Sequence, residues 1–341
     1  MRALRLISEE HLEFGNVPRP DAPVADEVLL RMQAVSLNHI DLFGLRGMAF
    51  AKRQLPLVVG VEASGIVEAL GPDAKGLAVG DLAVIYPGVF CGTCGWCRKG
   101  FENLCEDIRG IMGFHIDGMA REFLKVPAHR VVKVPNGVTA EQAACTTVTF
   151  ATVQHMLFDN AKLEPGETIL VQAGGSGIGS TAIKMAKAIG CTVITTVGSN
   201  DKIAKAKALG ADHVINYRED RFESMARRLT GKKGVDVVFE HTGPDTWAGS
   251  LLSLKRGGRL VTCGSTTGIS AQTNLYQIFQ QQLKIFGSFG SSVKNVRDSL
   301  DKMAAGIAPV IDTVIKLDEF PQAMERLRAR DVFGKIVARI A

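Results

Sequence analysis

The sequence contains no run of about 18 apolar residues and no block of lysine and arginine. The first absence argues against a membrane-spanning helix, and residues 1–14 also lack the apolar core of a secretory signal peptide. The second absence argues against nucleic acid as a partner, because a net charge of +5 is small for 341 residues. Repeats and low-complexity segments are missing as well. We therefore expect a cytoplasmic protein that binds neither nucleic acid nor a membrane.

The length and composition are those of an ordinary globular enzyme. A chain of 341 residues is long enough for two domains, and 46% hydrophobic with 22% charged residues is a typical balance. Small-molecule chemistry is therefore the function to look for.

The stretch Ile169–Gly190 has the pattern of a strand, a glycine-rich turn and a helix. Ile169–Val171 is a short apolar run typical of a strand buried on both faces, and apolar residues recur at helical spacing after the turn. Such a turn lets backbone N–H groups approach a pyrophosphate, whose charge the helix N-terminus favours. The pattern G-x-G-x-x-G is incomplete at its middle position, Ser176, and an ordinary strand-to-helix turn is the alternative. We predict a dinucleotide site whose turn comprises Gly174, Gly175, Ser176, Gly177, Ile178 and Gly179.

Strand-like and helix-like segments alternate from Ile169 to about residue 290, which predicts a doubly wound parallel sheet. Before residue 130, short β-like segments separated by glycine turns are typical of a small barrel-like domain. The last segment, Gly334–Ile340, is predicted to be a strand that returns to this domain. The fold class is therefore α/β. One domain is expected to comprise residues 1–150 and 290–341, and a dinucleotide-binding domain residues 151–289.

Four of the seven cysteines, Cys91, Cys94, Cys97 and Cys105, lie within fifteen residues. Grouped cysteines in a cytosolic chain indicate a metal more than disulfides. Their spacing lets four thiolates surround one ion, which favours a structural zinc with no open position for substrate. One rival is an iron–sulfur cluster, although the usual spacing to the fourth cysteine and the following proline are absent. The other rival is a pair of disulfides.

The four-cysteine segment and the glycine-rich turn occur together with five further motifs: Gly60–Gly65, Val79–Asp81, Asp117–Phe123, Ala208–Ala211 and Gly257–Arg259. With these motifs the chain resembles, over essentially its whole length, the medium-chain dehydrogenase/reductase superfamily of zinc alcohol dehydrogenases and quinone oxidoreductases. The resemblance implies a GroES-like catalytic domain made from both chain ends. It also implies a Rossmann domain between them and an active cleft at their junction.

Three departures from the family pattern concern the catalytic zinc. In zinc alcohol dehydrogenases this ion is held by a cysteine, a histidine and a second cysteine or an acid. The resemblance places Asn38 at the first position, Val61 at the second and, by a looser alignment, Val148 at the third. Valine binds no metal, so we expect that the catalytic site is lost and the structural zinc is kept. Asp41 and Glu62 remain, but they are outer groups in the family.

The loss of these ligands is typical of quinone and enone reductases. Without zinc an unactivated alcohol is a poor substrate, whereas a quinone or a double bond conjugated to a carbonyl is already polarised. The resemblance thus implies an NADPH-dependent reductase. Its catalytic candidates are Asn38 and Thr152, as donors to an enolate, and His39, as a proton donor or a partner of the cofactor pyrophosphate. The alternatives are an alcohol dehydrogenase with an unusual metal set that includes His39, and an NADPH-binding protein without catalysis.

The expected preference for NADPH depends on the end of the second strand of the dinucleotide domain. NAD enzymes place an acid there for the ribose hydroxyls, whereas this chain has Gly198. Ser199, Lys202 and Tyr217 are suited to a 2′-phosphate, although a helix cap at Ser199 with a solvated lysine is the alternative. The resemblance also places Thr242, Gly264 and Ser288 beside the cofactor. It further implies a homodimer or homotetramer, with Lys284–Ser288 in the dimer interface.

Overall fold

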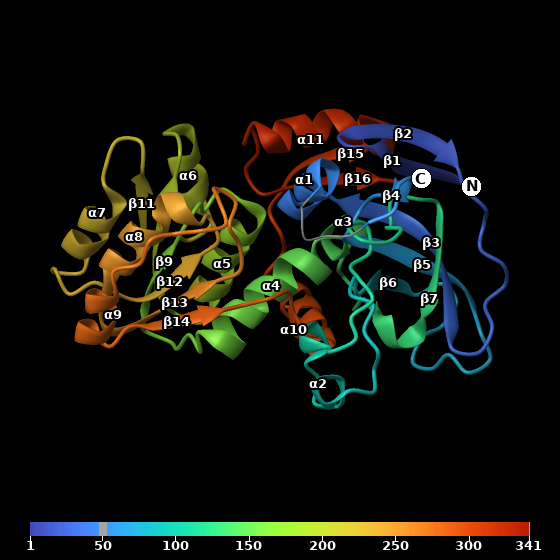
Figure 1. Cartoon of the computed structure of the whole chain (residues 1–341), viewed down its shortest axis with the longest axis horizontal. Helices are drawn as coiled ribbons and strands as arrows, with labels where there is room; N and C mark the ends of the chain where they lie inside the picture. Colours follow the sequence, from blue (N-terminus) through green and yellow to red (C-terminus); the bar gives the residue numbers. More distant parts are fainter. Residues whose placement is uncertain (48–52, 341) are drawn as a thin grey trace. The chain divides into compact units, whose positions relative to one another are not determined.

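The computed structural model describes residues 1–47 and 53–340. The chain forms two compact units, which are considered separately below (Figure 1). Unit 1 comprises Met1–Ala151 and Ser291–Ala341, and unit 2 comprises Thr152–Gly290. In the part of the chain that is described, no helix has both the length and the apolar character needed to cross a bilayer.

Unit 1 is built on two sheets, most of whose pairings are antiparallel. The larger sheet has the order β15-β16-β3-β5-β6-β8, and β7 pairs with β3. Its strands are β3 (Glu27–Ser36), β5 (Ala63–Leu70), β6 (Leu82–Ile85), β7 (Phe123–Pro127), β8 (Val131–Lys133), β15 (Ile311–Lys316) and β16 (Lys335–Arg339). The smaller sheet contains β1 (Arg2–Ser8), β2 (His11–Asn16) and β4 (Leu57–Val58). Because β16 pairs with β3, the predicted return of the last strand to the first domain is confirmed.

The helices of unit 1 are short, apart from two near its C-terminal end. They are α1 (His39–Arg46), α2 (Gly95–Arg98), α3 (Ala140–Ala143), α10 (Val293–Ala304) and α11 (Phe320–Arg328). The stretch from Ala140 to Asn160 is helical but does not form one α-helix. Two π-helical turns, Thr146–Phe150 and His155–Asn160, flank α4 (Ala151–Gln154).

The apolar stretch from Val58 to Leu70 does not form one continuous strand. Gly60 interrupts it with a φ of +92°, a backbone conformation that favours glycine. A Cβ at Gly60 would lie 2.9 Å from Val35 Cγ2 and 3.0 Å from the Ala120 backbone nitrogen. The close approach ends β4 and places Val61 and Glu62 directly before β5.

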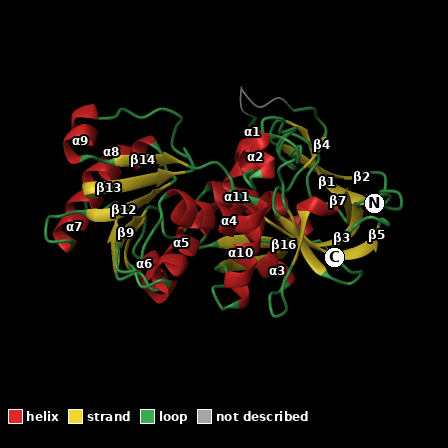
Figure 2. Cartoon of the chain, turned by 90° about the horizontal axis from the view of Figure 1, so that it is seen from below, coloured by secondary structure: helices red, strands yellow, loops and turns green. Residues whose placement is uncertain are grey.

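Unit 2 confirms the predicted parallel α/β sheet. Six strands pair in parallel in the order β11-β10-β9-β12-β13-β14, so the order reverses between β9 and β12 (Figure 2). The strands are β9 (Thr168–Val171), β10 (Thr192–Val197), β11 (His213–Asn216), β12 (Val235–Glu240), β13 (Leu254–Thr262) and β14 (Lys284–Gly287). Its helices include α5 (Gly177–Ala188), α6 (Asp201–Ala208), α7 (Phe222–Leu229), α8 (Pro244–Ser253) and α9 (Leu275–Gln281). In such sheets, ligands bind beyond the carboxyl ends of the strands at the point of reversal.

Candidate functional site

The residues predicted to bind the cofactor follow the six strands of unit 2. The glycine-rich turn follows β9, Gly198 follows β10 and Tyr217 follows β11. On the other half of the sheet, Thr242, Gly264 and Ser288 come shortly after β12, β13 and β14. Because all six strands are parallel, these positions lie along one edge of the sheet. Unit 2 therefore brings the predicted cofactor residues to the same edge.

The turn after β9 fits a pyrophosphate group. A Cβ at Gly174 would lie 2.2 Å from Thr195 Oγ1, and one at Gly179 would lie 2.3 Å from the Ala173 carbonyl oxygen. Ser176 is the N-cap of α5, and its side chain accepts the Gly179 N–H at 3.0 Å. This cap explains the serine at the middle position of the motif. The first turn of α5 offers backbone N–H groups without intrahelical acceptors, as anion binding requires.

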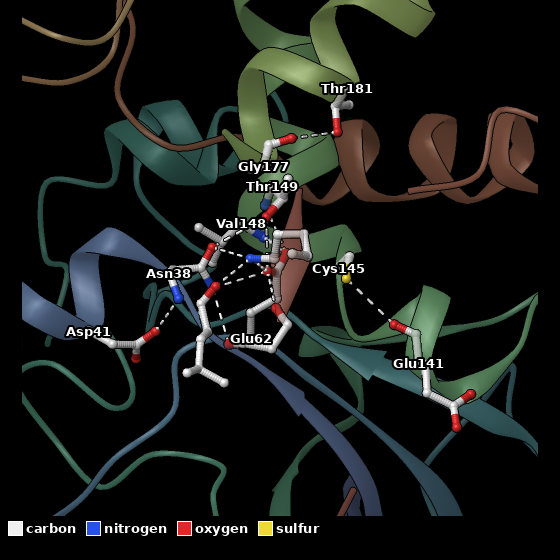
Figure 3. Close-up of polar contacts among 12 residues, drawn as sticks. Asn38, Asp41, Glu62, Glu141, Cys145, Val148, Thr149, Gly177 and Thr181 are labelled. Atoms are coloured by element: carbon white, nitrogen blue, oxygen red, sulfur yellow. Dashed lines mark hydrogen bonds and ion pairs between the residues drawn. The ribbon is translucent and has the colours of Figure 1, made fainter. Parts of the chain in front are cut away.

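The first turn of α5 is itself held by side-chain hydrogen bonds. Thr181 donates from Oγ1 to the Gly177 carbonyl oxygen at 2.9 Å (Figure 3), and Ser180 donates to the same oxygen at 3.0 Å. Gly175 and Ile178 are half-buried within the turn and the helix start.

A side chain at the end of β10 would require Tyr217 to move. A Cβ at Gly198 would lie 2.5 Å from the Tyr217 hydroxyl oxygen, so the tyrosine occupies the space where an acid would project. A hydrogen bond from Ser199 holds the pKa of Asp201 below its usual value, which engages Ser199 at the start of α6. Lys202 lies in the first turn of this helix. Arg218, which the sequence reasoning missed, is exposed directly after Tyr217.

The remaining predicted residues of unit 2 lie in ordered segments. Thr242 donates its backbone N–H to Glu240 Oε1 at 2.6 Å, and Ser288 Oγ accepts a hydrogen bond from Asn160 Nδ2 at 3.0 Å. A Cβ at Gly264 would lie 2.8 Å from the His241 carbonyl oxygen. Thr152 lies in α4 and is half-buried.

A buried charged network in unit 1 surrounds Glu62 (Figure 3). Glu62 is 0% exposed, and its Oε1 accepts the backbone N–H groups of Val148 and Thr149, both at 2.7 Å. Its Oε2 accepts from Ser36 Oγ at 2.6 Å and from Lys335 Nζ at 3.2 Å. The π-helical turn Thr146–Phe150 thus directs two N–H groups at one carboxylate oxygen.

Asn38 belongs to the same network, and all of its side-chain groups are engaged. Its Nδ2 donates to the Ser36 carbonyl oxygen at 3.2 Å and to Glu62 Oε2 at 3.1 Å. Its Oδ1 accepts from Lys335 Nζ at 2.6 Å and from Thr149 Oγ1 at 3.3 Å. Both amide hydrogens are therefore used within the protein. A direct hydrogen bond from Asn38 to substrate stays a prediction that requires one of these bonds to break.

The three positions at which the catalytic zinc ligands are expected to be missing lie around Glu62. Asn38 donates to its carboxylate, Val61 precedes it in the chain, and Val148 donates a backbone N–H to it. Val61 is fully buried. His39 is the first residue of α1 and is half-buried. In the described residues the three ligand positions therefore carry an amide and two valines, which do not form a zinc site.

The two acids near Asn38 have opposite pKa shifts. Burial by itself raises the pKa of Glu62, but Lys335 and hydrogen bonds from Ser36 and the backbone of Thr149 and Val148 hold it below its usual value. Burial raises the pKa of Asp41 to about 7, and the charge of Lys335 offsets this only in part. Glu62 is therefore ionised at neutral pH, whereas Asp41 changes its charge near pH 7 and is neutral only at lower pH.

Lys335 is the member of this network that the sequence reasoning missed. It is 4% exposed in β16, and a buried lysine requires hydrogen-bond or charge partners. Its position between Gly334 and three apolar residues was the available signal. The partners themselves lie near residues 38 and 62, which no local pattern relates to residue 335.

The four clustered cysteines form a candidate metal centre in unit 1. Their sulfur atoms lie within 4.8 Å of one another, with Cys91 Sγ 3.9 Å from Cys97 Sγ and 3.6 Å from Cys105 Sγ. Zn–S bonds of about 2.3 Å in a tetrahedron require sulfur separations of about 3.8 Å. No disulfide joins these cysteines, which removes that alternative. Backbone N–H groups of Thr93 and Cys94 point at Cys91 Sγ, as is usual for a thiolate ligand.

This centre fits a structural zinc held by Cys91, Cys94, Cys97 and Cys105. Among residues 1–47 and 53–340 it is the one group of three or more cysteine, histidine or acidic side chains close enough to hold a metal. The four cysteines can therefore hold a zinc ion, whereas the three ligand positions beside Glu62 carry residues that do not form a zinc site.

Comparison with known proteins gives the same architecture over the whole chain. The alcohol dehydrogenase GroES-like domain model matches residues 24–136, and the zinc-binding dehydrogenase model matches residues 177–305. Sorbitol dehydrogenase of Bacillus subtilis (strain 168) is 30% identical over 335 residues, which cover 96% of this chain and 93% of that protein. Acryloyl-coenzyme A reductase of Sulfurisphaera tokodaii is 30% identical over 329 residues and 96% of each protein. A crystal structure of an NAD-dependent alcohol dehydrogenase matches with a TM-score of 0.94 and 37% identity over 100% of both chains.

A parallel dinucleotide-binding sheet and a GroES-like unit with a four-thiolate metal centre define a dehydrogenase of the zinc-binding type. The chain belongs to the medium-chain dehydrogenase/reductase superfamily, and it is an oxidoreductase of that group.

Proposed function

We propose that the protein is an NADPH-dependent reductase of quinones or of carbon–carbon double bonds conjugated to a carbonyl, and that it works without a catalytic metal. The observation that carries this proposal is the site around Glu62. The three positions expected to hold the catalytic zinc carry Asn38, Val61 and Val148, and the groups there are engaged in an internal network with Lys335.

The proposed substrates follow from what this site lacks. A zinc ion acts as a Lewis acid that polarises a carbonyl and lowers the pKa of an alcohol. A conjugated carbonyl or a quinone accepts a hydride more readily, because its own oxygen takes the resulting negative charge. Acryloyl-coenzyme A, in the name of one relative, is such a conjugated compound. The sorbitol and alcohol dehydrogenase relatives support the alternative, which is alcohol oxidation.

The cofactor supplies the hydride when it is bound, and the protein supplies its position. In unit 2 the turn from Gly174 to Gly179 and the start of α5 would hold the pyrophosphate. Gly198 offers no carboxylate to bind the ribose hydroxyls, and the Tyr217 hydroxyl lies beside it, which supports NADPH over NADH. Lys202 and Arg218 are the cations proposed to bind the 2′-phosphate.

The test is a substrate panel with both reduced cofactors. Enzyme with about one zinc per chain is assayed with NADPH or NADH against enones, enoyl thioesters, quinones and ketones, and with the oxidised cofactors against alcohols. We expect turnover of the activated substrates with NADPH and turnover of simple alcohols lower by several orders of magnitude. Faster turnover of alcohols or ketones would refute the proposal and favour the alcohol dehydrogenase alternative.

The control for this panel is a variant altered in the turn proposed to bind the cofactor, with its folding checked by circular dichroism before the assay. In Gly174→Val the added Cβ would lie 2.2 Å from Thr195 Oγ1, so the turn must shift. Activity that survives in this variant comes from a contaminating enzyme. An absence of turnover of any substrate, together with tight NADPH binding by the wild type, would indicate a binding protein without catalysis.

A further inference from the structure

Asp41 is the second carboxyl group near Asn38, and the described residues give a hydrogen-bond partner to only one of its two oxygens. The residue lies in the first turn of α1 and is 3% exposed. Its Oδ2 accepts the Asn38 backbone N–H at 2.8 Å (Figure 3). Its Oδ1 is buried without a hydrogen-bond partner among the described residues. An ionised carboxylate in this setting is costly, because burial removes the water that would solvate the charge.

The ammonium group of Lys335, whose charge acts on Asp41, already donates its hydrogen bonds to other groups. An ammonium group has three N–H donors. Those of Lys335 go to the Leu37 carbonyl oxygen at 2.8 Å, to Asn38 Oδ1 at 2.6 Å and to Glu62 Oε2 at 3.2 Å. No donor of Lys335 is left for Asp41, and the carboxylate of Glu62 repels a second negative charge.

The cations on the described segments that pack against α1 are engaged with other groups, and Arg53 donates to the Leu45 carbonyl oxygen at 3.4 Å. Helix α11 contacts α1, and its two arginines near this surface pair with acids elsewhere: Arg326 with Asp312 and Arg328 with Glu10. The loop that contains Phe114 packs on Gly44 of α1. Burial lowers the pKa of the neighbouring His115, which is therefore neutral at pH 7.

We propose that Asp41 is a positioning residue that works as a neutral carboxylic acid, with its proton on Oδ1. In this form Oδ2 holds the backbone of Asn38 at the start of α1, and the Asn38 side chain stays between Lys335 and Glu62. Ionisation of Asp41 adds a second carboxylate that competes with Glu62 for one ammonium group. Asn38 then loses its fixed position, and the site is disordered at alkaline pH.

The direction of the pH dependence follows from this assignment. The pKa of Asp41 is raised by burial from 3.8 to about 7. A raised folded-state pKa gives stability that is present at low pH and is lost as the pH rises through the folded value. With a pKa of 3.8 in the unfolded chain and about 7 in the folded protein, the folding equilibrium constant should fall by about a hundredfold between pH 5 and pH 8.5.

The first experiment measures urea unfolding of the full chain at pH 5 and at pH 8.5. Asp41→Asn carries no titrating group, so the folding constant of the wild type relative to this variant should fall about a hundredfold between the two pH values. The control is Asp21→Asn, at an exposed loop position, for which the ratio should not change. Glu62→Gln is the matched buried variant, and its ratio should fall less than that of Asp41→Asn because Asp41 still titrates in it, without the repulsion from Glu62. A ratio for Asp41→Asn that is constant or rises with pH overturns the proposal.

The second experiment detects the proton directly and does not need a stable variant. The infrared carbonyl band of a protonated carboxyl group should be present in wild-type protein at pH 5.5 and should disappear as the pH passes about 7. Asp21→Asn should keep the band and Asp41→Asn should lose it. Wild-type protein without this band at pH 5.5 overturns the proposal.

A third readout rests on the proposed function, because it uses reductase activity. Asp41→Asn should keep the neutral-pH kcat within a few-fold and remove the alkaline decline in kcat, with little change in the KM for NADPH. A decline that persists in the variant contradicts the positioning role. If no substrate is turned over, the proposed function fails, whereas unfolding and infrared measurements still decide the state of Asp41.

Discussion

Lys335→Met tests the buried network most directly, because it removes one charge from an enclosed ion pair. Methionine keeps an unbranched chain of similar length, so the loss of packing is small. Glu62, 0% exposed, then holds a buried charge without its cation, and the Leu37 carbonyl oxygen loses its ammonium donor. Removing one partner of a buried pair typically costs about 3–5 kcal/mol. Glu62 keeps neutral donors from Ser36, Asn38, Val148 and Thr149, so we expect a value near about 3 kcal/mol.

The assay is a double-mutant cycle measured by urea unfolding at pH 7. The chain has two tryptophans, Trp96 in unit 1 and Trp247 in unit 2, so a Trp247→Phe background leaves a reporter for unit 1 alone. Glu62→Gln and the double variant complete the cycle. We expect the double variant to lose less stability than the sum of the single variants by about 2 kcal/mol or more, because no unpaired charge is left buried.

The matched control is a partly exposed ion pair of the same unit. Lys125 and Glu27 are 3.0 Å apart with side chains 25% and 29% exposed, and Lys125→Met should cost about 1 kcal/mol or less. Lys335→Met should also lose its effect as the pH falls, because protonation of Glu62 removes the unpaired charge. The reasoning is refuted if Lys335→Met costs no more than the control, or if the two substitutions of the cycle are additive.

Three further predictions concern the metal, the cofactor and the assembly. Elemental analysis should find about one zinc per chain, and Cys97→Ser should lower both the zinc content and the stability of its segment; two equivalents would contradict the loss of the catalytic site. Lys202→Ala should weaken the binding of NADPH much more than that of NADH in a titration, and equal wild-type affinity for both cofactors would refute the assignment. We propose that the edge strand β14 forms the dimer interface, since its Ile285 is 38% exposed. Ile285→Lys should shift the sedimentation of the protein from dimer to monomer, and an unchanged dimer would exclude this edge.

The sequence by itself determined the features that depend on neighbouring residues. The run from Ile169 to Gly190 predicts a strand, a turn and a helix, because each has a local signature, and the structure contains all three. The spacing of the four cysteines predicts their convergence, since all four lie within fifteen residues. The identities of Asn38 and Val61 likewise show which metal ligands are missing without reference to any distance.

The tertiary structure decided how the residues near Asn38 are used. Lys335 reaches Glu62 across 273 positions of sequence, because β16 pairs with β3 and not because of any local pattern. The same pairing commits the amide of Asn38, which the sequence presents as a free donor. Whether the Asp41 carboxyl group is solvated or buried without a second partner depends only on the residues that enclose it. The charge of Asp41 is therefore set by its burial and by the geometry of the Lys335 ammonium group. Neither can be read from the residues that neighbour position 41 in the sequence.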